Sequence, residues 1–337
     1  MSGSSSYRGR FAPSPTGHLH FGSLVAAVGS YAEARARGGQ WLVRMEDLDR
    51  PREVSGAAAD ILRTLDAFGF AWDGPVLYQR QRTRAYAAAL AHLGAQGLTY
   101  PCRCSRREIA LAAATTGPEG PIYPGTCRPA LIPAVPPRRG TGMPPLPSHH
   151  PPCPSTTPPA TPHAAPETVS TGQEAIRLRV ETPPLTFHDR VQGPIVQDLV
   201  TEVGDFILRR ADSLFAYQLA VVVDDAFQGI TDVVRGADLT HSTPRQMLLQ
   251  RLLGLPTPTY AHLPLARDPL GRKLSKSDAT APVDPRDPLP ALLRAWAFLG
   301  QPALTERLGT PAEFWSQALG RWDLARVPPV AVIPGAV

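Results

Sequence analysis

The stretch KLSKS, residues 273–277, holds both lysines of a 337-residue chain in which lysine and arginine together number 34. Arginine is a planar fork that holds phosphates and carboxylates bidentately, whereas lysine is a compact charge on a flexible stem that can follow a moving phosphate. We therefore interpret Lys273 and Lys276, with the serine hydroxyls and the preceding Gly271, as a phosphate-handling loop. The alternative is an ordinary solvated turn.

A second stretch suited to phosphate spans residues 10–23, RFAPSPTGHLHFGS. It predicts a short strand, a turn stiffened by prolines and the start of a helix, whose N-terminus offers free N–H groups and positive potential to a phosphate. Gly22 would let a nucleotide approach the backbone, and His20 could donate to a phosphate as charge develops. A histidine in this place is by itself more often a cap or a surface residue, so the interpretation depends on its combination with the lysine loop.

A third set of residues has the chemistry of a zinc site: Cys102, Cys104, Tyr123 and Cys127. Two thiolates two residues apart, followed by a third after a loop, suit tetrahedral zinc, although tyrosine is an unusual fourth ligand. Three ordinary buried thiols are the alternative. Further possible ligands fall in a proline-rich segment, where we expect disordered side chains: His149, His150, Cys153 and His163.

Composition narrows the class of protein. Hydrophobic residues make up 43% of the chain, and no apolar run approaches the ~20 residues that span a bilayer. The first six residues contain no apolar signal region, and four cysteines are too few for a disulfide framework, so we expect a cytoplasmic protein without membrane contact. The formal charge of +5 permits a polyanionic partner without demonstrating one.

The elements that must position these residues alternate between strand and helix. Residues 8–13 and 41–45 predict strands, and residues 22–37 and 57–68 predict amphipathic helices. An opening of this kind is typical of a Rossmann-like parallel α/β sheet, in which ligands bind at the ends of the strands.

The proline-rich segment divides the chain. Residues 128–166 contain 14 of the 39 prolines and no Asp or Glu, a composition that cannot build a packed core. We expect four parts: a Rossmann-like catalytic domain of residues 1–100 and 175–285, a zinc-binding insert 101–128, a disordered insertion 129–174, and a short, mainly helical C-terminal region 286–337.

Several blocks of this sequence resemble a known family. HLHFGS and KLSKS are similar to the two signature motifs of class I aminoacyl-tRNA synthetases. The longer blocks RFAPSPTGHLHFG, VRMEDLDRPR, LAVVVDDAFQGITDVVRGADL and HLPLARDPLGRKLSKS more narrowly resemble the glutamyl-tRNA synthetases. These blocks cover most of residues 8–278 outside the insertion.

The resemblance implies roles for individual residues. It assigns catalysis and the binding of ATP, accompanied by Mg²⁺, to His20, Gly22, Lys273 and Lys276, the last of which would steady the phosphates during adenylate formation. It assigns glutamate binding to Arg10, Ser14, Glu46, Tyr217 and Arg235. It implies one structural Zn²⁺ on Cys102, Cys104, Tyr123 and Cys127. These assignments are consistent with charge complementarity. The two carboxylates of glutamate can bind arginine guanidiniums, and its ammonium group can bind a carboxylate.

The chain most resembles a short paralogue of glutamyl-tRNA synthetase that lacks the anticodon-binding half. That resemblance implies ATP-dependent activation of L-glutamate and its transfer to queuosine at the wobble position of tRNA(Asp), by a monomer. Three alternatives stay open: a truncated glutamyl-tRNA synthetase that charges a tRNA 3′ end, a class I nucleotidyl transferase acting on a small acid, and a non-catalytic tRNA-binding module.

Overall fold

The computed structural model describes residues 7–117, 120–130, 174–265, 282–304 and 307–329. The expected phosphate-handling residues Lys273 and Lys276 lie outside these ranges. So do the four further metal ligands considered above, namely His149, His150, Cys153 and His163.

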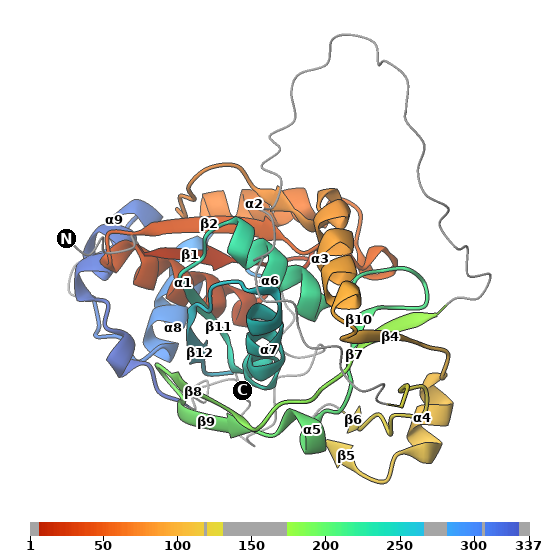
Figure 1. Cartoon of the computed structure of the whole chain (residues 1–337). Helices are drawn as coiled ribbons and strands as arrows, with labels where there is room; N and C mark the ends of the chain where they lie inside the picture. Colours follow the sequence, from red (N-terminus) through yellow and green to blue (C-terminus); the bar gives the residue numbers. More distant parts are fainter. Residues whose placement is uncertain (1–6, 118–119, 131–173, 266–281, 305–306, 330–337) are drawn as a thin grey trace, which may run out of the picture.

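Parallel strands form the centre of the molecule (Figure 1). Neighbours pair in parallel in the order β3 (Leu77–Tyr78), β2 (Gln40–Met45) and β1 (Arg8–Phe11), and β11 (Asp232–Gly236) pairs in parallel with β12 (Thr259–Leu263). The Thr231 N–H donates to the Arg8 carbonyl at 3.0 Å, which places the start of β11 beside β1. The expected parallel α/β architecture is confirmed.

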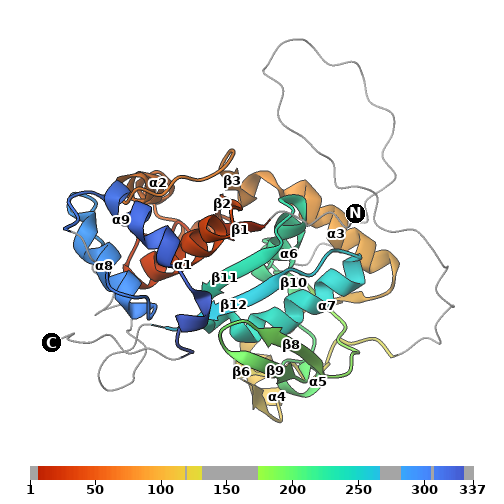
Figure 2. The same cartoon turned by 90° about the vertical axis from the view of Figure 1, so that its left-hand side faces the viewer.

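Helices pack on both faces of these strands (Figure 2). One face carries α1 (Phe21–Ala36), α2 (Ala57–Ala67), α8 (Pro288–Phe298) and α9 (Pro311–Ala318). The other carries α3 (Thr83–Ala95), α6 (Tyr217–Phe227) and α7 (Thr243–Leu253). Within the described residues, no helix has both the length and the apolar character that crossing a membrane requires.

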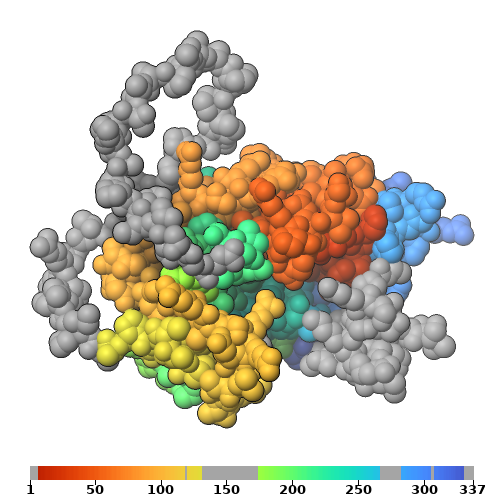
Figure 3. Space-filling model, turned by 90° about the vertical axis from the view of Figure 1, so that its right-hand side faces the viewer, coloured from red at the N-terminus to blue at the C-terminus, as the bar shows by residue number. Residues whose placement is uncertain are grey.

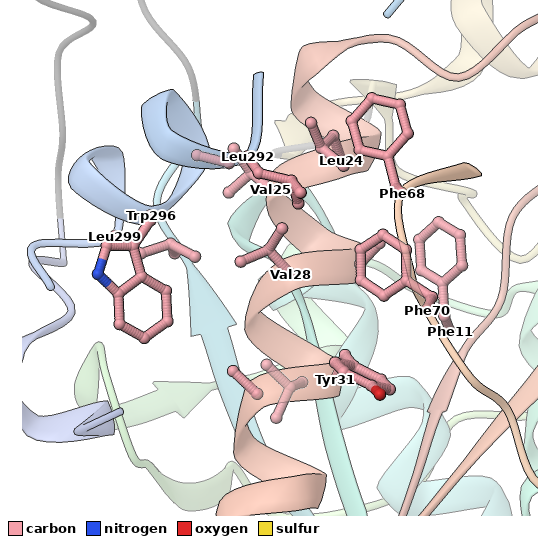
Figure 4. Packing of buried hydrophobic residues seen from close by; sticks show 14 of the residues in the cluster. Phe11, Leu24, Val25, Val28, Tyr31, Phe68, Phe70, Leu292, Trp296 and Leu299 are labelled. Atoms are coloured by element: carbon pink, nitrogen blue, oxygen red, sulfur yellow. The ribbon is translucent and has the colours of Figure 1, made fainter. Parts of the chain in front are cut away.

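The larger core lies around α1 (Figure 4). Leu24 and Val28 are fully buried, and α8 contributes the buried Leu292 and Trp296 to the same cluster. Burying each large apolar side chain contributes about 1.5–3 kcal/mol. The C-terminal region that was expected to be helical thus includes α8 and α9, and α8 packs against α1.

The remaining elements are short strands and helices outside the parallel sheet. An antiparallel sheet has the order β10 (Ile207–Arg209), β7 (Ala175–Leu178) and β4 (Thr99–Cys102). Two hairpins are β5 (Thr116–Gly117) with β6 (Gly120–Pro121), and β8 (Leu185–Asp189) with β9 (Gly193–Gln197). Short helices are α4 (Arg106–Ala112), α5 (Leu199–Glu202), and the 3-10 turns η1 (Arg50–Arg52), η2 (Gln79–Gln81), η3 (Ala237–Ser242), η4 (Leu319–Arg321) and η5 (Leu324–Arg326).

Candidate active site and thiol cluster

A cavity of about 950 Å³ opens at the carboxyl ends of the parallel strands. Its lining includes all five residues expected to bind glutamate, which are Arg10, Ser14, Glu46, Tyr217 and Arg235. It also includes His20 and Gly22 from the start of α1. Residues up to 225 positions apart in sequence therefore meet where parallel α/β folds bind their ligands.

His20 forms the N-cap of α1. Its Nδ1 accepts the Ser23 N–H at 3.4 Å, and its Nε2 lies 3.0 Å from the Ser23 hydroxyl. A Cβ on Gly22 would lie only 3.2 Å from the imidazole, so glycine makes room for the ring. Burial lowers the pKa of His20 below its ordinary value, although Asp238 raises it in part. The ring is therefore neutral at pH 7 and able to donate a hydrogen bond.

The flanks of the lysine loop reach the same cavity. Leu265 and Pro282, on either side of the segment 266–281, both line it. Pro282 forms a β-bridge with His20, and the Val283 N–H donates to the Leu19 carbonyl at 3.0 Å. The described chain therefore ends at the cavity wall before the segment of Lys273 and Lys276 and begins again beside the His20 turn.

A buried ion-pair network holds Arg10, one of the arginines that line the cavity. Arg10 donates through Nε and Nη2 to Asp225, at 3.1 and 3.3 Å. The fully buried Arg44 donates to the same carboxylate at 2.7 Å and lies 3.4 Å from Glu46. Burial raises the pKa of Asp225, but Arg10 and Arg44 outweigh that effect and hold it below its ordinary value. Asp225 is therefore ionised, and within the described residues it binds Arg10 through Nε and Nη2.

Glu46 differs from Asp225 in its electrostatics. Burial raises its pKa above the ordinary value, and Arg44 and Arg10 offset only part of that shift. A carboxylate in this environment gains from a cation placed in the cavity, because a nearby positive charge favours its ionised form. The geometry thus suits a ligand with an ammonium group at Glu46 and carboxylates at the arginines.

The sequence analysis did not identify Asp224 and Asp225, the buried carboxylates that bind polar side chains next to the cavity. Asp224 accepts from the Tyr86 hydroxyl at 2.6 Å, from Arg82 at 3.0 Å and from Gln79 at 3.1 Å. In the sequence, Asp224 and Asp225 directly follow the apolar run of residues 214–223. Two aspartates directly after such a run are the signal that could have identified them, because buried carboxylates require partners.

The thiol cluster lies away from the cavity, in the segment shown in yellow and orange that projects below the body (Figure 3). The sulfurs of Cys102, Cys104 and Cys127 lie within 4.8 Å of one another. The Tyr123 hydroxyl is 3.4 Å from the Cys102 sulfur and 3.8 Å from that of Cys104. A backbone hydrogen bond from Arg103 is the main cause that lowers the pKa of Cys127 to about 7, which favours thiolate. The donor set is compatible with zinc.

Comparison with known proteins gives the family. A model of the catalytic domain of class I tRNA synthetases for Glu and Gln matches residues 6–123 and 161–300. A glutamyl-Q tRNA(Asp) synthetase of Dechloromonas aromatica is 53% identical over 332 residues, 98% of either chain. Another from Chromobacterium violaceum is 50% identical, covering 96% of this chain and 95% of that one.

Solved structures agree on the fold. A glutamate-tRNA synthetase from Elizabethkingia anophelis superposes with a TM-score of 0.73 and 22% identity, covering 97% of this chain and 68% of that one. A glutamate tRNA ligase from Elizabethkingia meningosepticum gives a TM-score of 0.74 at 22% identity, covering 98% and 67%. The chain has the class I synthetase catalytic fold and belongs to the glutamyl-Q tRNA(Asp) synthetase family.

Proposed function

We propose that the protein activates L-glutamate with ATP and transfers it to queuosine at the wobble position of tRNA(Asp). The observation that carries this proposal is the near-complete match, end to end, with relatives of that name at about half identity. The cavity supports it, because Arg10, Glu46 and Arg235 present two cations and one carboxylate to a ligand. Glutamate has the complementary two carboxylates and one ammonium.

The chemistry needs two steps. The α-carboxylate of glutamate attacks the α-phosphorus of ATP, and pyrophosphate leaves. A hydroxyl of the queuosine cyclopentenediol then attacks the acyl carbon of the adenylate, and AMP leaves. Mg²⁺ that accompanies ATP would neutralise phosphate charge. We assign ATP contacts to His20, Gly22, Lys273 and Lys276 through charge-assisted hydrogen bonds and close backbone approach.

The remaining glutamate contacts follow from the cavity. Tyr217 and Ser14 add hydroxyl groups beside the two arginines. We also propose that the chain is divided into a catalytic domain of residues 1–100 and 175–285, a metal-binding insert 101–128, a proline-rich insertion 129–174 and a helical region 286–337.

A truncated enzyme that charges a tRNA 3′ end is the second candidate. The same glutamyl adenylate can react with a hydroxyl of queuosine or with a hydroxyl of the terminal ribose.

The function is tested by glutamate transfer to two tRNA pools, one from cells that make queuosine and one from cells that cannot. Pyrophosphate exchange across a panel of amino acids is measured in the same preparation. We expect exchange with glutamate and labelling of the queuosine-containing pool alone. Exchange with a different acid, or no exchange, would contradict the activation step. Equal labelling of both pools would favour the second candidate.

We further propose that Cys102, Cys104, Tyr123 and Cys127 bind one structural zinc ion. Cys104→Ser should then release the metal and lower the melting temperature, because a structural site contributes its binding free energy to folding. Cys153→Ser is the matched control, since Cys153 is the remaining cysteine of the sequence and is not one of the four proposed ligands. Metal analysis of protein purified without chelator decides the matter, and less than about 0.2 zinc per chain would contradict a structural site.

Deleting residues 131–168 should leave glutamate activation within about twofold of the intact chain, because the cost of closing a loop grows only logarithmically with its length. The two sides of the deletion are already held together. Cys102 pairs with Ala175 in the β4–β7 ladder, and Arg179 donates to the Pro129 carbonyl at 2.8 Å. Pyrophosphate exchange and thermal unfolding measure the effect. Loss of folding would show that the segment packs against the catalytic domain.

A further inference from the structure

The Arg235 side chain is fixed by a series of hydrogen bonds to buried polar groups. The side chain lies on β11, directly across from His262 on β12. Its Nε donates to Nε2 of His262 at 3.0 Å, and its Nη2 donates to the Thr243 hydroxyl at 2.8 Å. Nη1 lies 3.3 Å from the Tyr217 hydroxyl. All three nitrogens therefore have a protein partner, and the partner of Nη1, Tyr217, lines the cavity together with Arg235.

These contacts fix the proton on His262. A guanidinium can only donate hydrogen bonds, so Nε2 of the imidazole must accept, and the ring proton must sit on Nδ1. Nδ1 lies 2.6 Å from Oδ2 of Asp189, a carboxylate that can only accept. Both side chains are fully buried. Burial lowers the pKa of His262 to about 4, against the raising effect of Asp189, so the ring stays neutral at pH 7.

Asp189 is itself fixed by the backbone. Its Oδ1 accepts the N–H groups of Val191 at 3.0 Å, Gln192 at 2.9 Å and His262 at 3.0 Å. It ends strand β8, so the turn of the β8–β9 hairpin is joined to β12. The imidazole is also restrained by stacking, since its plane lies 6° from that of Tyr260 with ring centroids 6.1 Å apart.

We propose that Asp189 and His262 are positioning residues for substrate glutamate: Asp189 sets the tautomer of His262, and His262 orients the Arg235 guanidinium so that Nη1 faces the ligand. This inference rests on the proposed function, in which Arg235 binds a glutamate carboxylate. An arginine side chain left without its acceptor would rotate among several conformers and would have to be ordered on each binding event. The pair therefore lowers the cost of binding glutamate.

The alternative is that Asp189 and His262 only stabilise the core and do not position Arg235. The substitution Asp189→Asn distinguishes the positioning role from the purely structural one. The amide oxygen can still accept the three backbone N–H groups, but the amide nitrogen donates toward Nδ1 of His262. The imidazole proton then moves to Nε2, where it opposes the Nε–H of Arg235, and a wrong tautomer of this kind is costly even when the geometry is intact.

The experiment measures KM for glutamate and KM for ATP by pyrophosphate exchange. For Asp189→Asn and His262→Phe, which keeps a stacked ring but no acceptor, we expect the glutamate KM to rise about 10- to 100-fold, the range for a lost hydrogen bond to a charged group. The ATP KM should stay within about twofold, since no contact to ATP is removed. His262→Gln, whose amide oxygen can accept from Arg235, should recover part of the loss.

His188→Phe is the matched control, because His188 is an exposed histidine on the same strand. Its kinetic constants should equal those of the unmodified protein. A glutamate KM within about threefold of the unmodified value for Asp189→Asn and His262→Phe, or equal losses for glutamate and ATP, would overturn the proposal. Loss of folding in Asp189→Asn, His262→Phe and His262→Gln alike would also overturn the proposal. If the unmodified protein does not activate glutamate, the proposed function itself fails.

Discussion

Asp225→Asn should lower the free energy of unfolding by about 3–5 kcal/mol and abolish most glutamate activation, because it leaves buried cations without their counter-charge. The carboxylate bridges Arg10 and Arg44, whose side chains are 3% and 0% exposed. In the Asp225→Asn variant, Glu46 would be the one carboxylate still paired with Arg44 among the described ion pairs. Urea unfolding followed by fluorescence gives the stability change, and pyrophosphate exchange gives the activity.

The matched control for this variant is Asp284→Asn. Asp284 pairs with Arg286 at 3.0 Å, a distance like that of the buried pair, but the two side chains are 46% and 88% exposed. Exposed pairs contribute little, so unfolding should hardly change. Similar losses from Asp225→Asn and Asp284→Asn would show that burial of the network is not what matters.

The pH dependence of stability follows from the same carboxylate. The pKa of Asp225 in the folded chain lies below its ordinary value. Its contribution is therefore complete at neutral pH and is lost as the pH falls from about 4, the ordinary pKa of Asp, through the lower folded value. In Asp225→Asn this part of the acid transition should disappear.

Lys276→Arg should reduce adenylate formation by about 10²–10³ in rate while the charge is kept, since one preorganised donor at a transition state has roughly that effect. The reason is the confinement of both lysines of the chain to this loop, whose flanks line the cavity. A planar guanidinium cannot place a compact charge on the phosphate as an ammonium can. Arg286→Lys, at an exposed position, is the control for a swap between the two cations. Exchange within about threefold of the unmodified protein would show that any cation suffices there.

The sequence indicated which residues would line the cavity, because the blocks that contain them resemble those of a known family. Arg10, Glu46 and Arg235 lie far apart in the chain, yet each falls in a block with recognisable chemistry, and the fold brings all three to one cavity. The helix spans were also predictable from periodicity: α1 begins at Phe21 and ends at Ala36, against an expected 22–37.

The residues behind the site could not be predicted in the same way. Asp225 meets Arg10 across 215 positions, and Asp189 meets His262 across 73. No local spacing encodes such pairs, which depend on how β8, β12 and α6 pack in space. The apolar run at residues 214–223 was similarly uninformative. Residues 217–223 of this run form the first part of helix α6, where residues 218–223 are all buried, so the segment lacks the polar face that would have given it a helical period.

The central claim is that glutamate is attached to queuosine and not to the 3′ end of the tRNA. It is tested most directly by charging queuosine-containing tRNA(Asp) with labelled glutamate, digesting the product with a base-specific nuclease and identifying the labelled fragment. We expect the label in the anticodon fragment that contains queuosine and none on the terminal adenosine. Label on the terminal adenosine would contradict the account and make the chain a charging enzyme of the ordinary kind.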